Sequence, residues 1–236
     1  MIYIYIIMFD NIILIPYRNR EAHLDYFIKN TIPLFREHLP NSKVVVIEQT
    51  GGKLFNRGKI LNVGFKEYEN KSNYFFTHDV DINPTAICID DFYSMKCNSD
   101  EIIAIYTSEC NTLGGIIKCN NETIFKINGF PNDIWGWGTE DKALQNRSEF
   151  FNISKITCLT TAKEHPKYIL RFNDVDDRKK SSAFNSNTYF QYNQFNNLNS
   201  NKKEELIFAT GLNNIEYKII SRKTINDIVE LIKVEI

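Results

Sequence analysis

The stretch NIILIPYRNREAHLDYFIKNTIPLFREHLPNSKVVVIE (residues 11–48) decides the fold. It opens with a continuous apolar run ended by Pro16, which is typical of a strand buried on both faces of a mainly parallel sheet. Apolar residues then recur at helical spacing from Glu21 to Phe35, and the β-branched residues 42–48 indicate a second strand. We therefore predict a β-α-β opening and an α/β fold.

The chain downstream continues the same alternation of strands and helices. Residues 74–77 predict a short strand that leads into the acidic sequence His78-Asp79-Val80-Asp81. Further strands are predicted at residues 102–106 and 115–118, and a helix at residues 141–147 that begins with an acid. Ligands bind at the carboxyl ends of strands in open α/β sheets, so this acidic pair is a candidate site.

The last third of the chain is predicted to hold a loop and two closing strands. Residues 181–201 are polar and rich in Asn with interleaved aromatics, which favours a long loop. Residues 215–236 alternate apolar and polar positions in two segments, as closing strands do. No second hydrophobic unit stands out, so residues 1–236 are predicted to form one domain.

Composition narrows the class of protein and its compartment. The 236 residues are 43% hydrophobic, and Lys plus Arg (28) balance Asp plus Glu (29). We expect a globular protein with no affinity for nucleic acid or an anionic membrane. The five cysteines include no CxxC pair, which favours a reducing compartment, and the apolar residues 1–9 are too short to cross a bilayer. These features predict a cytoplasmic protein without a signal peptide or a membrane span.

Two carboxylates two residues apart, in Asp79-Val80-Asp81, could bind a hard divalent cation that bridges the phosphates of a nucleotide-sugar. The tripeptide alone is weak evidence, because Asp174-Val175-Asp176 repeats it in a polar segment. Its place at a predicted strand end favours the first copy.

Arginines beside aromatics form a second group of candidates. Arg18 and Arg20 follow the first strand, and Phe55 precedes Arg57 by two positions. Arginine suits bidentate phosphate recognition, and the helix that follows Arg20 would add its N-terminal dipole. The alternative is that these are surface arginines packing their stems on aromatic rings.

The segment Trp135-Gly-Trp137-Gly-Thr-Glu140-Asp141 places both tryptophans of the chain next to two acids. An indole that stacks on a pyranose face, beside carboxylates that bind its hydroxyls, is a means of gripping sugars. A purely structural role is the alternative for the tryptophans, although a core segment would not normally end in Glu-Asp.

Together these residues resemble the β-1,4-galactosyltransferase family, also called glycosyltransferase family 7. The matching segments, in the family's order, are IPYRNREAHL (15–24), FNRGKILNVGF (55–65), HDVDINP (78–84), GG (114–115), INGFPNDIWGWGTED (127–141) and GLNNIEY (211–217). The HDVD form resembles the xylosylprotein galactosyltransferase branch more than the branch that acts on N-acetylglucosamine.

The resemblance implies a GT-A fold with a mixed, mainly parallel sheet, and inverting, metal-dependent transfer of galactose or N-acetylgalactosamine from a UDP-sugar to a glycan or glycoside hydroxyl. A β-1,4 linkage and Mn²⁺ or Mg²⁺ are expected. Carried over by position, the donor site comprises Pro16, Tyr17, Arg18, Arg20, Phe55, Arg57, Asp79, Val80, Thr112 and Gly115; Trp137, Glu140 and Asp141 contact sugars; Asp81 and His165 bind the metal; and Asp141 is the general base.

Three departures from the family pattern bear on these roles. The family's second ligand near His165 is missing, because the matching positions hold Ala162 and Lys167. Lys142 stands where a third acid usually follows Glu-Asp, so the acceptor is expected to differ. Thr112 replaces a tyrosine common in the family, which leaves room for the C2 substituent of UDP-N-acetylgalactosamine.

Two other functions compete with the transferase. A non-catalytic sugar-binding module descended from this fold would fit the lost metal ligand and Lys142. A nucleotide-sugar hydrolase or phosphotransferase is the third hypothesis. An assay that detects transfer of the sugar to a glycan, rather than release of free hexose, would exclude it.

Overall fold

The structure, a computed structural model, describes residues 9–108, 112–136, 138–171, 192 and 194–236. Its strands are β1 (Phe9–Tyr17), β2 (Ser42–Gln49), β3 (Ser72–His78), β4 (Ile82–Pro84), β5 (Glu101–Thr107), β6 (Ile116–Asn120), β7 (Ser154–Thr160), β8 (Ile169–Arg171), β9 (Lys218–Thr224) and β10 (Val229–Glu235). Its helices are α1 (Glu21–His38), α2 (Arg57–Glu67), α3 (Ala86–Cys88), α4 (Asn121–Lys126), α5 (Glu140–Phe150) and α8 (Ser200–Ala209). A π-helical turn, Ile89–Tyr93, continues α3, and 3-10 turns lie at Phe195–Asn197 and Leu212–Asn214.

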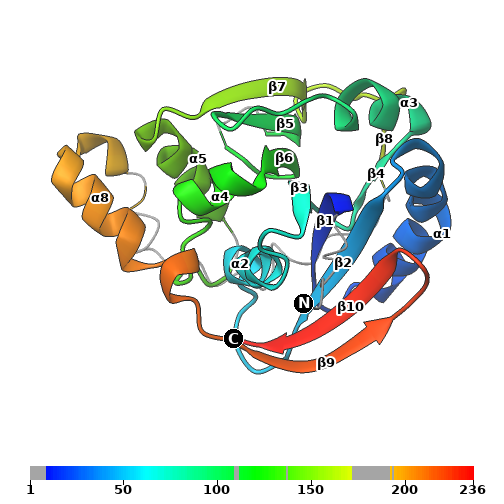
Figure 1. The fold of residues 1–236 in the computed structure, drawn as a ribbon, viewed down its shortest axis with the longest axis horizontal. Helices are drawn as coiled ribbons and strands as arrows, with labels where there is room; N and C mark the ends of the chain where they lie inside the picture. Colours follow the sequence, from blue (N-terminus) through cyan, green and yellow to red (C-terminus); the bar gives the residue numbers. More distant parts are fainter. Residues whose placement is uncertain (1–8, 109–111, 137, 172–191, 193) are drawn as a thin grey trace, which may run out of the picture.

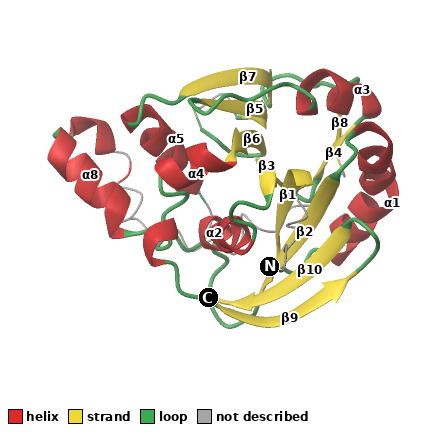
Figure 2. Cartoon of the chain, in the orientation of Figure 1, coloured by secondary structure: helices red, strands yellow, loops and turns green. Residues whose placement is uncertain are grey.

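Within the described ranges eight strands form one mixed sheet in the order β7-β5-β6-β3-β1-β2-β10-β9. β1 pairs in parallel with both β2 and β3, and β6 runs antiparallel to β3 and β5. The strands form a central layer between helices (Figure 2). The predicted β-α-β opening and the mixed, mainly parallel sheet are therefore confirmed.

Both faces of the central strands are buried, as the unbroken apolar run of β1 predicted. Ile13 and Ile15 belong to the core cluster that contains Phe27 and Phe35 of α1. The alternate residues of β1 belong to a second cluster built on α2 and α4. α1 and α3 accordingly cover one face of the sheet, and α2, α4 and α5 cover the other (Figure 1). Burial on both faces explains why β1 shows no polar alternation.

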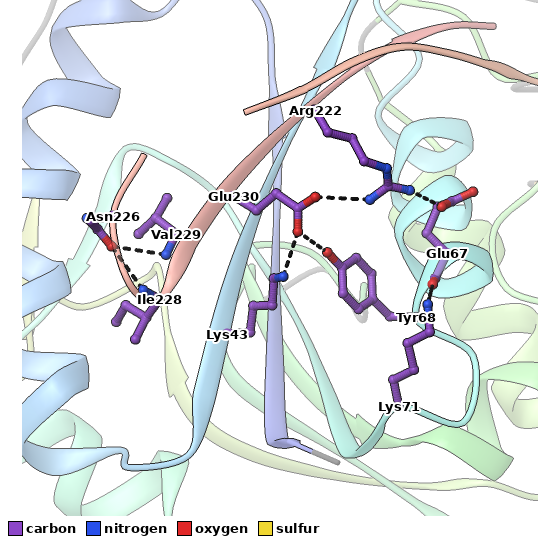
Figure 3. A network of polar contacts seen from close by, with 9 residues as sticks. All are labelled: Lys43, Glu67, Tyr68, Lys71, Arg222, Asn226, Ile228, Val229 and Glu230. Atoms are coloured by element: carbon purple, nitrogen blue, oxygen red, sulfur yellow. Dashed lines mark hydrogen bonds and ion pairs between the residues drawn. The ribbon is translucent and has the colours of Figure 1, made fainter. Parts of the chain in front are cut away.

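The closing strands form an antiparallel hairpin, β9–β10, whose second strand lies parallel to β2. A polar network joins this hairpin to the rest of the sheet (Figure 3). Glu230 accepts hydrogen bonds from Lys43 at 2.6 Å, from Arg222 at 3.0 Å and from the hydroxyl of Tyr68, while Arg222 also pairs with Glu67 of α2. The hairpin is thus held by charge as well as by the strand ladder.

The Asn-rich segment differs from the predicted loop where it is described. Residues 181–191 and 193 lie outside the described residues, but a 3-10 turn forms at Phe195–Asn197 and α8 begins at Ser200. The side chain of Asn199 accepts a hydrogen bond from the backbone N–H of Lys202, so this asparagine caps a helix. The end of the segment that was predicted as a loop from its composition therefore contains the start of a helix.

No helix in the described part of the chain has the length and apolar character needed to cross a bilayer.

Candidate active site

The predicted site residues gather at the edge of the sheet where β1, β2 and β3 end. Parallel pairing places Tyr17, Gln49 and His78 at one edge, and the antiparallel β6 begins at the same edge because Ile116 is the partner of His78. The loops that follow β1, β2 and β3, together with the loop before β6, therefore surround one site. This is the edge at which ligands bind in open α/β sheets.

An arginine at the start of α2 joins two of the predicted acids. Nε of Arg57 donates to Oδ1 of Asp79 at 2.9 Å, and its Nη1 donates to Oδ1 of Asp141 at 2.8 Å. The side chain of Arg57 is 10% exposed, and its Nη2 is buried with no hydrogen-bond partner among the described residues. Burial alone would lower the pKa of Arg57, but the charges of Asp79, Asp141 and Glu140 raise it above its ordinary value. Arg57 is a fixed cation whose Nη2 amino group donates to no described residue.

The first turn of α5 carries two acids with different environments. Asp141 keeps 29% of its side chain exposed and pairs with Arg57. Glu140 is buried, and one of its oxygens has no hydrogen-bond partner in the described part of the chain. Burial, and then the charge of Asp141, raise the pKa of Glu140 to about 8. Burial and the neighbouring charge thus favour the protonated form of Glu140, whereas Asp141 is held by a cation.

Two glycines allow the backbone before β6 to pass beneath Asp141. A Cβ at Gly114 would lie 2.2 Å from Oδ2 of Asp141, so any larger residue there would displace the Asp141 carboxylate. Gly115 has a φ of 73°, and a Cβ there would lie 2.3 Å from the carbonyl oxygen of Tyr106. The Gly115 carbonyl accepts a hydrogen bond from the N–H of Asp79 at 3.2 Å, which ties this loop to the acidic turn. The sequence indicated Gly114 only as part of a family motif. Its contact with Asp141 depends on where α5 lies and has no local sequence signal.

Arg18 and Arg20 lie at the same edge but make different contacts. The guanidinium of Arg18 stacks on Phe55 with 5.2 Å to the ring centroid, and it donates to the carbonyl of Lys53 at 2.7 Å. Arg20 donates to Oδ2 of Asp81 at 3.5 Å. The contact of Arg18 with Phe55 joins the two predicted arginine-plus-aromatic units at one surface, although the two residues lie 37 positions apart in sequence.

The segment with the tryptophans is bonded directly to the loop that carries Phe55. The N–H of Gly136 donates to the carbonyl of Phe55 at 2.8 Å, and the Lys53 ammonium lies 5.3 Å from the ring centroid of Trp135. Asn56 Nδ2 adds a hydrogen bond to the carbonyl of Asn132 at 2.9 Å. Trp137, predicted to contact sugar, lies outside the described residues. Lys53 was not predicted as a site residue, since a lone lysine in a polar loop carries no sequence signal.

The two residues predicted to bind metal lie at different ends of a short ladder. β4 follows Asp81 and pairs antiparallel with β8, so that Ile82 is opposite Arg171 and Pro84 is opposite Ile169. His165 precedes β8 at the Ile169 end, which leaves roughly 10 Å of strand between its backbone and that of Asp81. Nε2 of His165 lies 3.0 Å from the Thr160 carbonyl, so Nε2 donates and Nδ1 keeps the free lone pair. Among the described residues, no three His, Cys, Asp or Glu side chains converge as a metal site.

Two of the remaining predicted residues, Pro16 and Tyr17, are buried at the end of β1, and Val80 is buried in the acidic turn. Thr112 precedes the two glycines, and its hydroxyl lies 2.6 Å from the hydroxyl of Ser108. Its carbonyl accepts a hydrogen bond from Thr107 at 2.6 Å. The loop between β5 and β6 thus presents Thr112 in a fixed position at the same edge.

Comparison with solved structures shows the fold type. A Drosophila β-1,4-galactosyltransferase 7, solved as a complex with manganese, UDP-Gal and xylobiose, superposes with a TM-score of 0.75 at 21% identity, covering 97% of this chain and 94% of that one. GalNAc-T7, solved with UDP, GalNAc and Mn²⁺, gives a TM-score of 0.51 at 10% identity over 86% of this chain and 55% of that one. The GT-A fold predicted from the sequence is confirmed.

Comparison of sequences identifies the family. Residues 8–98 match the model of the N-terminal region of glycosyl transferase group 7, and residues 95–169 match that of the N-terminal domain of galactosyltransferase. β-1,4-galactosyltransferase 4 of Homo sapiens is 31% identical over 220 residues, which are 89% of this chain and 58% of that protein. β-1,4-galactosyltransferase 1 of Bos taurus is 34% identical over 152 residues, which are 60% of this chain and 37% of that protein. This chain therefore belongs to the group 7 glycosyltransferases, the family of the β-1,4-galactosyltransferases.

Proposed function

We propose that the protein is an inverting, metal-dependent glycosyltransferase that moves galactose or N-acetylgalactosamine from a UDP-sugar to a hydroxyl of a sugar acceptor. The observation that carries this proposal is the arrangement of Asp79, Arg57 and Asp141, joined by two short ion pairs at the carboxyl edge of the sheet. Family membership and the galactosyltransferase activity named for its relatives support it.

In this proposal the donor's UDP occupies the loops after β1 and β2. The Arg18 guanidinium and the Phe55 ring offer a stacked cation and aromatic face for the nucleoside, and Pro16 and Tyr17 form the end of the strand beneath them. Arg20 and the unused Nη2 of Arg57 supply donors for phosphate oxygens. Asp79 and Val80 line the side of the donor nearest the sheet.

The residues present can supply part of a site for Mn²⁺ or Mg²⁺. Asp81 offers a carboxylate that is 25% exposed, and carboxylate oxygens suit these hard cations. The Arg20 guanidinium lies 3.5 Å from Oδ2 of Asp81, so the Asp81 carboxylate is paired with a positive side chain in this structure. His165 is the proposed second protein ligand through Nδ1, which requires the segment before β8 to move towards Asp81. A bound divalent cation would neutralise charge on the leaving diphosphate.

Asp141 is proposed as the general base. Its carboxylate is partly exposed, is fixed by Arg57 and lies against Gly114, where an acceptor hydroxyl can approach. In a single displacement that hydroxyl loses its proton as it attacks, and a fixed carboxylate within hydrogen-bond reach can take it. In this proposal Glu140 and Trp137 contact the sugars.

The experiment that tests the proposal is the substitution Asp141→Asn, assayed by UDP release and by UDP binding. Loss of a general base lowers kcat by about 10²- to 10⁴-fold while UDP binding in the presence of Mn²⁺ remains. The alternative, a non-catalytic sugar-binding module, predicts no acceptor-stimulated UDP release from the wild type. Formation of a glycoside product rather than free hexose separates transfer from hydrolysis.

The choice of donor is proposed to depend on Thr112. Its short side chain, fixed against Ser108, leaves space for an acetamido group at C2 of the donor sugar. Thr112→Tyr should then lower turnover of UDP-N-acetylgalactosamine relative to UDP-galactose. Turnover of the acetylated donor by the wild type that is no better than that of the variant contradicts this assignment.

The acceptor is proposed to be a glycan or glycoside, tested first with xylosides because the Drosophila relative was solved with xylobiose. A cytoplasmic location stays a prediction, and fractionation of cells that express the tagged full-length chain measures it.

A further inference from the structure

His78, at the end of β3, is enclosed by aromatic side chains directly behind the acidic turn. Its exposed fraction is zero. The rings of Phe27 and Phe35 of α1 have centroids 5.3 and 6.2 Å from that of His78, and the Tyr93 ring lies at 6.2 Å. An imidazole in such a cage carries a polar edge that must be satisfied from within the protein.

One ring nitrogen of His78 contacts the backbone of the acidic turn. Nδ1 lies 2.9 Å from the carbonyl oxygen of Asp79. A carbonyl only accepts, so Nδ1 carries the hydrogen and Nε2 is left as an acceptor. Nε2 has no hydrogen-bond partner in the described part of the chain. Burial lowers the pKa of His78 to about 4, against the raising effects of the Asp79 carbonyl and the Asp81 charge, so the ring is neutral at pH 7.

The same carbonyl oxygen closes the turn that carries both acids. The N–H of Ile82 donates to the Asp79 carbonyl at 3.2 Å, the i to i+3 bond of a β-turn through Val80 and Asp81. Two hydrogen bonds thus converge on one oxygen, one from the turn and one from His78. The orientation of that carbonyl sets the direction in which the Asp81 carboxylate leaves the turn.

We propose that His78 is a positioning residue: its neutral Nδ1–H fixes the Asp79 carbonyl and thereby holds the β-turn that presents Asp81. Its effect on metal affinity rests on the proposed function, whereas its effect on the turn does not. His78 is fully buried, so the proposed role requires no contact with donor or acceptor. The cage contributes packing, and the single N–H contributes the orientation of the turn.

Two substitutions separate these contributions. His78→Phe fills the cage and removes the unpaired Nε2, but it cannot donate to the Asp79 carbonyl. His78→Asn keeps a donor near the place of Nδ1 and leaves a cavity in the cage. We expect His78→Phe to unfold within a few degrees of the wild type and to bind Mn²⁺ with UDP about tenfold more weakly. His78→Asn should show the reverse, a lower Tm with metal and UDP affinity close to the wild type.

Two measurements without metal decide the positioning role by itself. In ¹⁵N spectra of the histidines, the signals missing from His78→Phe identify the ring, and the Nδ1–H tautomer is expected from pH 6 to pH 8. The Ile82 amide should exchange with solvent about tenfold faster in His78→Phe than in the wild type, and His78→Asn should restore its protection. An Nε2–H tautomer, or an Ile82 amide equally protected in all three proteins, overturns the proposal.

Binding of UDP with and without Mn²⁺ tests the proposed metal-dependent function separately from the role of His78. If the wild type binds UDP equally with and without Mn²⁺, the proposed metal-dependent function is contradicted while the Ile82 exchange still decides the role of His78. If affinity falls in both variants in proportion to Tm, His78 is only a packing residue and the proposal is wrong.

Discussion

Arg57 and Asp141 lie 84 positions apart in sequence, and their side chains meet at 2.8 Å. The contact joins the first turn of α2 to the first turn of α5, two helices on the same face of the sheet. Because Arg57 also holds Asp79, one cation fixes the proposed base relative to the proposed donor site. The positions of these two acids are therefore not independent.

Replacing Arg57 should cost more activity than replacing any exposed arginine. Arg57→Gln leaves two partly exposed carboxylates without their shared partner, and we expect kcat/KM to fall by roughly a hundredfold, equivalent to about 3 kcal/mol. Steady-state kinetics with varied UDP-sugar measure the change. Arg36→Gln is the matched control, because its ion pair with Asp227 is exposed and its kcat/KM should stay close to that of the wild type. An Arg57→Gln enzyme with more than a tenth of wild-type activity would contradict the role of this cation.

A methyl group at Gly114 should displace Asp141. Its Cβ would lie 2.2 Å from Oδ2 of Asp141, so the carboxylate must turn away from Gly114. We expect Gly114→Ala to lower kcat at least about tenfold, since small misplacements of a catalytic group are costly. Gly51→Ala is the control, because Gly51 is exposed and a Cβ there meets nothing within 4 Å. Equal kcat values for the two variants would show that Asp141 is not tightly placed.

Glu140 should make the fold less stable in alkaline solution. Its pKa is raised to about 8 by burial and then by Asp141, so the folded protein holds a proton that the unfolded chain releases near pH 4.5. Stability contributed by the protonated carboxyl is complete below that pH and is lost as the pH rises through 8. Glu140→Gln mimics the neutral form, and its Tm should exceed that of the wild type at pH 9 and match it at pH 5. A constant difference in Tm across this range would refute the assignment.

Glu230 should make the fold less stable in acidic solution, the opposite dependence on pH to that of Glu140. Burial by itself would raise its pKa, but hydrogen bonds from Lys43, Tyr68 and Arg222 lower the pKa to about 2 (Figure 3). Its contribution to stability is present above about pH 4.5 and is lost as the pH falls through 2. Glu230→Gln should therefore lower Tm by several degrees at pH 7 and by little at pH 2, as measured by circular dichroism. Glu235→Gln, on the same strand at an exposed position, should leave Tm unchanged.

The sequence was sufficient for the elements whose residues are buried in a regular pattern. Residues 11–16 and 42–48 predicted β1 and β2 because strands buried on both faces are apolar throughout, and the HDVD motif was correctly placed at the end of a strand. The helix from Ser200 was not predicted, since its few buried positions give no helical stripe and its Asn199 cap resembles a loop residue.

Contacts between distant segments could not be predicted from local pattern. Arg57 was assigned to phosphate binding from its neighbours, and its ion pairs with Asp79 and Asp141 follow only from the arrangement of α2, β3 and α5. The position of His165 relative to Asp81 could not be predicted either. His165 matched the family by position, and it lies beyond the Ile169 end of the β4–β8 ladder. Asp174 and Asp176, the second acidic pair, lie outside the described residues.

The hydrogen bond from Gly136 to the carbonyl of Phe55 makes the two halves of the proposed site energetically linked. If a nucleotide restricts the Phe55 loop, it would also restrict the backbone beside Trp135, and an acceptor would then lose less conformational entropy on binding. Thermodynamic reciprocity then requires the acceptor to tighten nucleotide binding by the same factor. An order of addition, with nucleotide-sugar first, would follow from one peptide hydrogen bond between loops that are 81 positions apart.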